Sequence, residues 1–229
     1  MNGVIYYSNT GESKKIAQYF SKKTGYPSTD LRLLNKCFFE DVVLVFPVCC
    51  QNIPDMVKDF LPRLRAKRLI LVATYGRMCY GNVLYEAQKL YVKNPIVAAA
   101  YVPTKHSYLQ EESFEDFKSL APLIEKIKSG SREEIHVPRL YKNIFAGFAT
   151  GWRSRVGVKM WRDESCIDCK QCERECAVKG IKAGKTNKNC IRCMKCVTNC
   201  PANALHFSNR LPLRLYLKKK KINKVVLYI

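Results

Sequence analysis

The sequence predicts an α/β protein in which a doubly wound parallel sheet is followed by a second, small α+β domain. In the first half, nearly continuous apolar runs alternate with segments of helical periodicity, the pattern of parallel strands buried on both faces. In the second half, eight regularly spaced cysteines replace this pattern. At 229 residues, the chain is long enough for two domains.

Four apolar runs of the first half are predicted strands: Val4–Tyr7, Asp41–Phe46, Leu69–Thr74 and Ile96–Val102. Helices are predicted between and after them, first from a cap at Ser13 and then at Asp55–Arg65, Asn82–Val92 and Phe114–Lys128. In an open parallel sheet the ligand lies outside the carboxyl ends of the strands. The loops at 8–13, 47–53 and 74–81 are therefore expected to converge.

The first loop places hydroxyl and backbone N–H groups at a helix N-terminus, which suits a phosphate. Its residues are Ser8, Asn9, Thr10, Gly11, Glu12 and Ser13. The loop lacks the Gly-Lys-Ser/Thr of a P-loop and the glycines of a dinucleotide fingerprint, so a mononucleotide fits better. The alternative is a hydroxyl-rich turn before a helix with no ligand.

This loop resembles the Thr/Ser-x-Thr-Gly-x-Thr loop that wraps the FMN phosphate in flavodoxins. The resemblance implies a flavodoxin-like sheet that binds FMN, with the other two loops on either side of the isoalloxazine ring. These loops contribute Pro47, Val48, Cys49, Cys50, Gln51 and Asn52, and Thr74, Tyr75, Gly76, Tyr80 and Gly81.

The eight cysteines form an internal duplication. The spacing Cys166-x2-Cys169-x2-Cys172-x3-Cys176 returns 24 residues later as Cys190-x2-Cys193-x2-Cys196-x3-Cys200. Three thiolates spaced three residues apart can bind three corners of an iron–sulfur cube, but the chain cannot turn back sharply enough to reach the fourth. That ligand must come from the other repeat. A pair of zinc sites is the alternative.

The same spacing occurs in two-cluster bacterial ferredoxins. The resemblance implies two [4Fe–4S] clusters, one held by Cys166, Cys169, Cys172 and Cys200, the other by Cys190, Cys193, Cys196 and Cys176. Cys200 precedes Pro201, whereas Cys176 precedes Ala177. This departure keeps the ligand and loses only the fixed φ of proline.

Both modules in this order resemble flavodoxin–ferredoxin fusion proteins of anaerobes. Those proteins commonly have Pro-Val-Tyr-x-Gly where this chain has Pro47-Val48-Cys49-Cys50-Gln51. An aromatic ring is therefore missing, and Tyr75 and Tyr80 are expected to stack on the flavin instead. Cys49, Cys50 and Cys79 should face the flavin. They are interpreted as ordinary small residues, with a redox-active thiol or an extra metal site as the alternative.

The predicted divisions are a flavodoxin-like domain at 1–138, a basic aromatic connector at 139–155, a ferredoxin-like domain at 156–208 and a basic tail at 209–229. In the third segment, Val156–Arg162 is expected to pair with Ala204–Phe207. The connector is expected to pack across both modules, with a membrane-surface patch as the alternative. The tail can be solvated, add a strand or form a basic docking surface.

The net charge of +21 is unevenly distributed, since residues 139–229 hold 21 Lys and Arg against 5 Asp and Glu. An acidic redox partner such as a ferredoxin is therefore expected. Only the charge favours nucleic-acid binding, because the sequence contains no recognisable nucleic-acid-binding motif. No apolar run approaches the ~18 residues of a spanning helix, and thiolates need a reducing environment, so a cytoplasmic protein is expected.

These features predict an electron-transfer flavoprotein that passes low-potential electrons between two [4Fe–4S] clusters and FMN and on to a protein partner. The alternative is a flavin-dependent reductase of a small molecule, fed by the clusters, with room for its substrate at Cys49. His106 follows the last predicted strand of the sheet and can place a proton donor near the flavin. For this histidine a solvated or packed side chain is the favoured interpretation.

Overall fold

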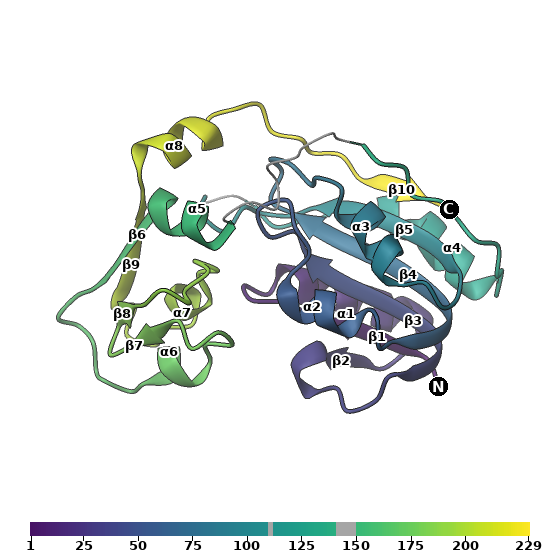
Figure 1. Cartoon of the computed structure of the whole chain (residues 1–229), viewed down its shortest axis with the longest axis horizontal. Helices are drawn as coiled ribbons and strands as arrows, with labels where there is room; N and C mark the ends of the chain where they lie inside the picture. Colours follow the sequence, from purple (N-terminus) through teal and green to yellow (C-terminus); the bar gives the residue numbers. More distant parts are fainter. Residues whose placement is uncertain (110–111, 141–149) are drawn as a thin grey trace. The chain divides into compact units, whose positions relative to one another are not determined.

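The computed structural model describes residues 1–109, 112–140 and 150–229. The chain divides into two compact units, one made of Met1–Ala146 with Lys221–Ile229 and the other of Gly147–Lys220 (Figure 1). The predicted connector at 139–155 lies largely outside the described residues. Its last part belongs to helix α5 (Thr150–Gly157) of the second unit.

The first unit is built on a six-stranded sheet with the order β2-β1-β3-β4-β5-β10. Its parallel strands are β1 (Gly3–Tyr6), β2 (Ser28–Asp30), β3 (Phe38–Pro47), β4 (Arg65–Tyr75) and β5 (Ile96–Pro103). All four predicted strands are confirmed, and β3 and β4 begin three or more residues earlier than predicted. Strand β2 was not predicted, because Ser-Thr-Asp carries no apolar signal.

Helices cover both faces of this sheet (Figure 1). Side chains alternate along β3, so that Leu44 joins one apolar cluster and Val43 the other. Helices α2 (Asp55–Phe60) and α3 (Val83–Leu90) pack in the first cluster. Helices α1 (Glu12–Thr24) and α4 (Ala121–Lys128) pack in the second. The doubly wound arrangement therefore follows from strands with two apolar faces.

Three predicted helix boundaries were wrong. Helix α1 begins at Glu12. Its N-cap residue is Gly11, with a φ of 94°, so the predicted cap Ser13 lies inside the helix. Helix α2 ends at Phe60; Leu61 still has helical backbone angles, but Pro62 has no N–H to continue the helical hydrogen bonds. The segment predicted as one helix at 114–128 is the 3-10 helix η2 (Phe117–Leu120) followed by α4, with Pro122 in the first turn.

The second unit holds two small antiparallel pairs. Strand β6 (Val158–Arg162) pairs with β9 (Leu205–Asn209), which confirms the predicted pairing. The other pair is β7 (Ile181–Lys182) with β8 (Lys185–Thr186). Short helices α6 (Gln171–Arg174) and α7 (Lys195–Thr198) lie within the two cysteine repeats.

The C-terminal segment adds a strand, one of the three alternatives left open for it. Helix α8 (Leu211–Leu217) begins with Pro212 in its first turn, where a proline is well tolerated. Strand β10 (Val226–Tyr228) then pairs antiparallel with β5 and closes the open edge of the first unit's sheet. The last nine residues thus belong to the first unit rather than to the second.

Candidate functional site

The duplication of the cysteine sequence is also a duplication of the backbone. Within the second unit, left-handed φ values recur at positions 24 residues apart, at Asp168 and Arg192, Lys170 and Met194, and Lys179 and Asn203. Residues with side chains rarely adopt this conformation, and it is found where the surroundings enforce it. The chain therefore makes the same sequence of turns around each set of cysteines.

The last cysteine of each repeat is held in the same way. The Gly180 N–H lies 3.1 Å from Cys176 Sγ, and the Ala204 N–H lies 3.3 Å from Cys200 Sγ. Both bonds join a sulfur to the N–H four residues further on. In each repeat, a backbone N–H is thus directed at the sulfur of the last cysteine.

The first site combines cysteines of both repeats. Cys166, Cys169 and Cys172 line one recess together with Cys200, and the recess encloses about 390 Å³, part of it open to solvent. Arg162 also lines it, with Nη1 3.7 Å from Cys166 Sγ. This is the combination that the ferredoxin resemblance implies for one [4Fe–4S] cluster, so the residues fit that group.

The thiols of the second site lie close enough to influence one another. Burial, followed by the charge of Cys190 and then of Cys176, raises the pKa of Cys193. Burial, followed by Cys193 and the other neighbouring thiols, raises the pKa of Cys196 to about 12. These thiols are therefore protonated at neutral pH unless a metal displaces their protons.

No group of three or more His, Cys, Asp or Glu residues within the described ranges is placed to hold a single metal ion. In a [4Fe–4S] cluster, by contrast, each thiolate binds a different iron atom.

The three predicted loops of the first unit meet at the carboxyl ends of the strands. The Ser13 and Thr74 hydroxyls share a buried hydrogen bond of 2.8 Å, and the Val48 N–H donates to the Thr74 carbonyl at 2.7 Å. Gly81 packs so closely on Gln51 that a Cβ at Gly81 would lie 2.9 Å from it. Ser13 and Thr74 thus tie the first loop to the third, and Gln51 and Gly81 tie the second to the third.

Charged side chains surround the 8–13 loop. Glu12 is buried, accepts a hydrogen bond from Ser113 at 3.1 Å and pairs with Lys15 at 3.4 Å and Lys105 at 3.9 Å. Arg32 donates to the Ser8 carbonyl at 2.8 Å. Sequence patterns did not indicate Lys105 or Arg32, because each approaches the loop from a distant part of the chain.

The 47–53 loop ends in a tight turn. Cys49 and Asn52 exchange two backbone hydrogen bonds of 2.9 Å, and Cys50 and Gln51 between them have φ values of 51° and 68°. Two positive φ values define a type I′ turn, which usually contains Asn or Gly. Cys50 is exposed at the tip of this turn.

The two predicted flavin-stacking tyrosines differ in position. Tyr75 is 1% exposed and donates to the Lys224 carbonyl at 2.6 Å, so its ring lies in the core and not on the loop surface. Tyr80 is half-buried and stacks on Tyr101 at a centroid distance of 4.2 Å. His106 lies against Gly76, since a Cβ at Gly76 would be 2.7 Å from its ring. Of the two tyrosines, Tyr80 lies nearer the surface.

Residues 186–206 match the 4Fe-4S binding domain family, and the match contains all four cysteines of the second repeat. No curated protein matches the chain. With the remaining cysteines, the match supports an iron–sulfur, ferredoxin-like domain that holds at least one [4Fe–4S] cluster and transfers electrons. Across the described ranges, no helix is both long and apolar enough to cross a membrane.

Proposed function

We propose that the chain is an electron-transfer flavoprotein that carries two [4Fe–4S] clusters and FMN. The main support is the recess in which Cys200 of the second repeat joins Cys166, Cys169 and Cys172 of the first. The recurring backbone angles of the two repeats support the reciprocal exchange, in which Cys176 would join Cys190, Cys193 and Cys196 in the other site. A reducing environment keeps these cysteines from forming disulfides, and metal binding displaces their protons. Both conditions favour the cytoplasm.

The FMN half of the proposal is supported by the sheet and its loops. Without β10, the strand order is 2-1-3-4-5, as in flavodoxin-like sheets, which bind FMN at the β1/β3 switch point. The loop at 8–13 would hold the phosphate, with the Ser8 and Thr10 hydroxyls around it, and the Gly11 N–H donates to Ser8 Oγ at 3.1 Å within the loop. The loops at 47–53 and 74–81 would enclose the ring. When bound, FMN accepts electrons in pairs or singly and so links one-electron to two-electron chemistry.

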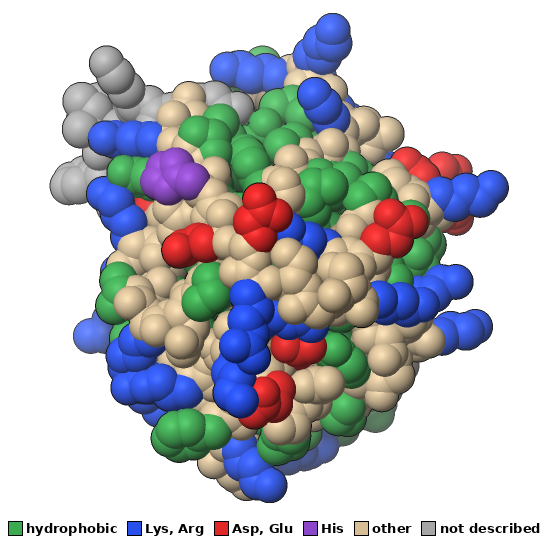
Figure 2. All heavy atoms as spheres, turned by 90° about the vertical axis from the view of Figure 1, so that its right-hand side faces the viewer, with side chains coloured by type: hydrophobic (Ala, Val, Ile, Leu, Met, Phe, Trp, Pro, Cys, Tyr) green, Lys and Arg blue, Asp and Glu red, His purple; other side chains and the backbone are tan. Residues whose placement is uncertain are grey.

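The charge distribution supports an acidic protein partner. Residues 1–138 hold 19 Lys and Arg against 14 Asp and Glu, and Figure 2 shows basic and acidic side chains interspersed on one face. Most of the excess positive charge lies beyond residue 138, where 21 Lys and Arg stand against 5 Asp and Glu. A basic surface raises the rate of encounter with an acidic carrier.

The test is a count of iron, labile sulfide and flavin on protein purified without oxygen. We expect about eight iron and eight sulfide atoms and one FMN per chain. In Cys200→Ser and Cys176→Ser, each count of iron and sulfide should fall to about half, because each variant removes a ligand of one cluster. Zinc in place of iron would refute the cluster proposal, whereas full iron without flavin would refute only the FMN half.

A flavin-dependent reductase is the second candidate. It is favoured by His106, which lies against Gly76 in the third loop, because reduction of an organic substrate needs a proton donor. Cys49 also leaves room where an aromatic ring is expected. Turnover of a small-molecule acceptor that is lost in Cys166→Ala would support this function. Electron transfer to a carrier protein alone would support the first.

A further inference from the structure

The two cysteine repeats share one backbone but differ in exposure. Cys169 is exposed, whereas Cys193, its counterpart 24 residues later, is only partly exposed. Lys170 is exposed, and its counterpart Met194 is 2% exposed. Directly before these two cysteines, an exposed Asp168 is replaced by Arg192, which is 9% exposed. The first site is open to solvent and the second is enclosed.

Two contacts inside the second unit contribute to the enclosure. The backbone at Gly180 packs on Cys190 so closely that a Cβ there would lie 2.6 Å from Cys190 Cα. Arg192 Nε donates to the Val158 carbonyl at 3.2 Å, which holds this side chain against β6. The corresponding Asp168 instead pairs with Arg162 at the rim of the open recess, at 3.7 Å.

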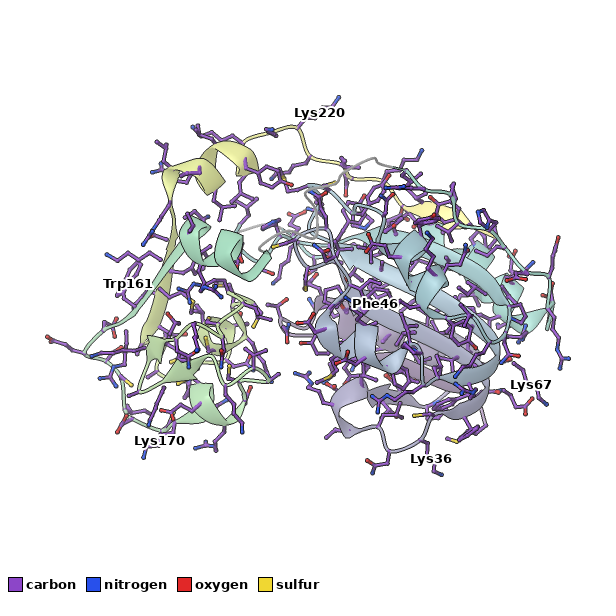
Figure 3. All side chains as sticks on the ribbon, viewed as in Figure 1. Lys36, Phe46, Lys67, Trp161, Lys170 and Lys220 are labelled. Atoms are coloured by element: carbon purple, nitrogen blue, oxygen red, sulfur yellow. The ribbon has the colours of Figure 1, made fainter. Side chains whose placement is uncertain are left out.

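The rim of the open site combines an apolar side chain with basic ones. Ile167 is 67% exposed and follows the ligand Cys166 directly. Arg174 donates to the Cys169 carbonyl at 2.6 Å, and Lys170 points into solvent (Figure 3). Two further exposed lysines, Lys182 and Lys185, lie on the β7–β8 pair, whose turn lines the recess.

Two acidic side chains line this recess, and both make contacts within the chain. Asp168 pairs with Arg162, and Glu173 accepts the Ala183 N–H at 2.6 Å. With Asp163 and Glu164, which lie just before Cys166 on the chain, the rim has four carboxylates, and the five basic residues Arg162, Lys170, Arg174, Lys182 and Lys185 outnumber them by one. Positive charge around an apolar centre suits a partner that carries carboxylates around an exposed redox centre.

We propose that the open site of Cys166, Cys169, Cys172 and Cys200 is where electrons cross between this chain and an acidic redox protein, while the enclosed site exchanges electrons only within the chain. This inference rests on the proposed function. Ile167 is the centre of the contact, and the basic residues around it steer the approach of the partner. One electron leaves the reduced partner and enters the chain, and no bond or proton is transferred.

The test is the rate at which a reduced, small, acidic two-[4Fe–4S] ferredoxin transfers electrons to the oxidised protein in anaerobic stopped flow. We expect Lys170→Glu/Lys182→Glu to slow the second-order rate about tenfold or more at low salt, with the difference shrinking as salt screens the charges. The matched control is Lys36→Glu/Lys118→Glu, which makes the same charge change at exposed lysines of the first unit. It should stay within about twofold of wild type.

Equal slowing in the rim and control variants would overturn the inference, because only net charge would then matter. A wild-type rate that does not change with salt would instead refute the acidic partner of the proposed function.

Ile167→Ala, compared with Leu33→Ala on the first unit, tests the apolar contact without changing charge. We expect only Ile167→Ala to lower the rate at high salt, and unchanged rates in both would refute the central role of Ile167. Iron counts and visible spectra equal to those of wild type confirm that each variant holds its full complement of clusters and flavin.

Discussion

At the scale of single residues, the cysteine sites depend on neighbours that carry no ligand atom. Left-handed φ values at non-glycine residues, repeated at Lys170 and Met194, shape both loops. Gly180 has a different role: it allows two backbone segments to approach, because no Cβ separates it from Cys190. A ligand in the second site is thus positioned by a residue that contributes no side chain.

Gly180→Ala should therefore disturb the enclosed site. The added Cβ would lie 2.6 Å from Cys190 Cα, a backbone atom that cannot move aside cheaply. We expect the iron count to fall toward half, with a lower melting temperature for the second unit. Gly130→Ala is the control, since nothing lies within 4 Å of its added Cβ and its φ of 70° costs only about 1 kcal/mol. Full iron in Gly180→Ala would contradict the close packing.

At the scale of elements, a buried ion pair joins β3, β4 and the end of α4. Arg68 on β4 forms two hydrogen bonds to Asp41 on β3 and donates to the Ile127 carbonyl at 2.9 Å. Tyr26 donates to Asp41 at 2.7 Å. Burial alone would raise the pKa of Asp41, but the hydrogen bonds from Arg68 and Tyr26 outweigh it and lower that pKa.

Asp41→Asn should destabilise the first unit by about 3 kcal/mol or more at pH 7, because Arg68 is left buried without its carboxylate. The folded pKa of Asp41 lies below the ordinary value of about 3.9, so its contribution to stability is complete above pH ~4 and is lost as pH falls through the folded pKa. Urea unfolding across this range should show the variant and wild type converging in acid. Glu40→Gln, next to it but exposed, should change stability little.

The added strand β10 is the second contact between distant elements. It covers the edge of β5, and the Lys224 carbonyl before it accepts the Tyr75 hydroxyl. An open strand edge is a site for intermolecular pairing.

Deletion of residues 221–229 should lower the melting temperature of the first unit by several degrees and cause self-association. Thermal unfolding and size-exclusion chromatography provide the measurements, and removal of Ile229 alone is the control. A stable monomer after the deletion would show that β10 contributes little.

At the scale of the whole molecule, the two units are stabilised by different means. The first has two large apolar clusters on either side of its sheet. The second has short strands and few buried apolar side chains, among them Val158, Ile181 and Leu217. A unit of this kind depends on bound metal for its folding free energy.

Removal of iron by a chelator with an oxidant should therefore unfold the second unit and leave the first folded. Hydrogen exchange followed by mass spectrometry should show lost protection within 150–220, while β3, β4 and β5 stay protected. Equal loss of protection in both units would indicate that the metal stabilises the whole chain.

The sequence by itself determined the features that depend on local pattern. Four strands could be predicted because each is apolar on both faces, and the duplicated cysteine pattern could be recognised because its spacing repeats. It did not reveal β2, which is short and polar, or the cap at Gly11.

Only the tertiary structure decided which of two repeated cysteine loops is enclosed, that Tyr75 lies in the core, and that the last residues complete the first sheet. These outcomes depend on contacts between residues far apart in the chain, such as Tyr75 with Lys224 and Arg192 with Val158. Hydrophobic periodicity and ligand spacing describe neighbours along the chain and carry no information about which distant surface will cover them.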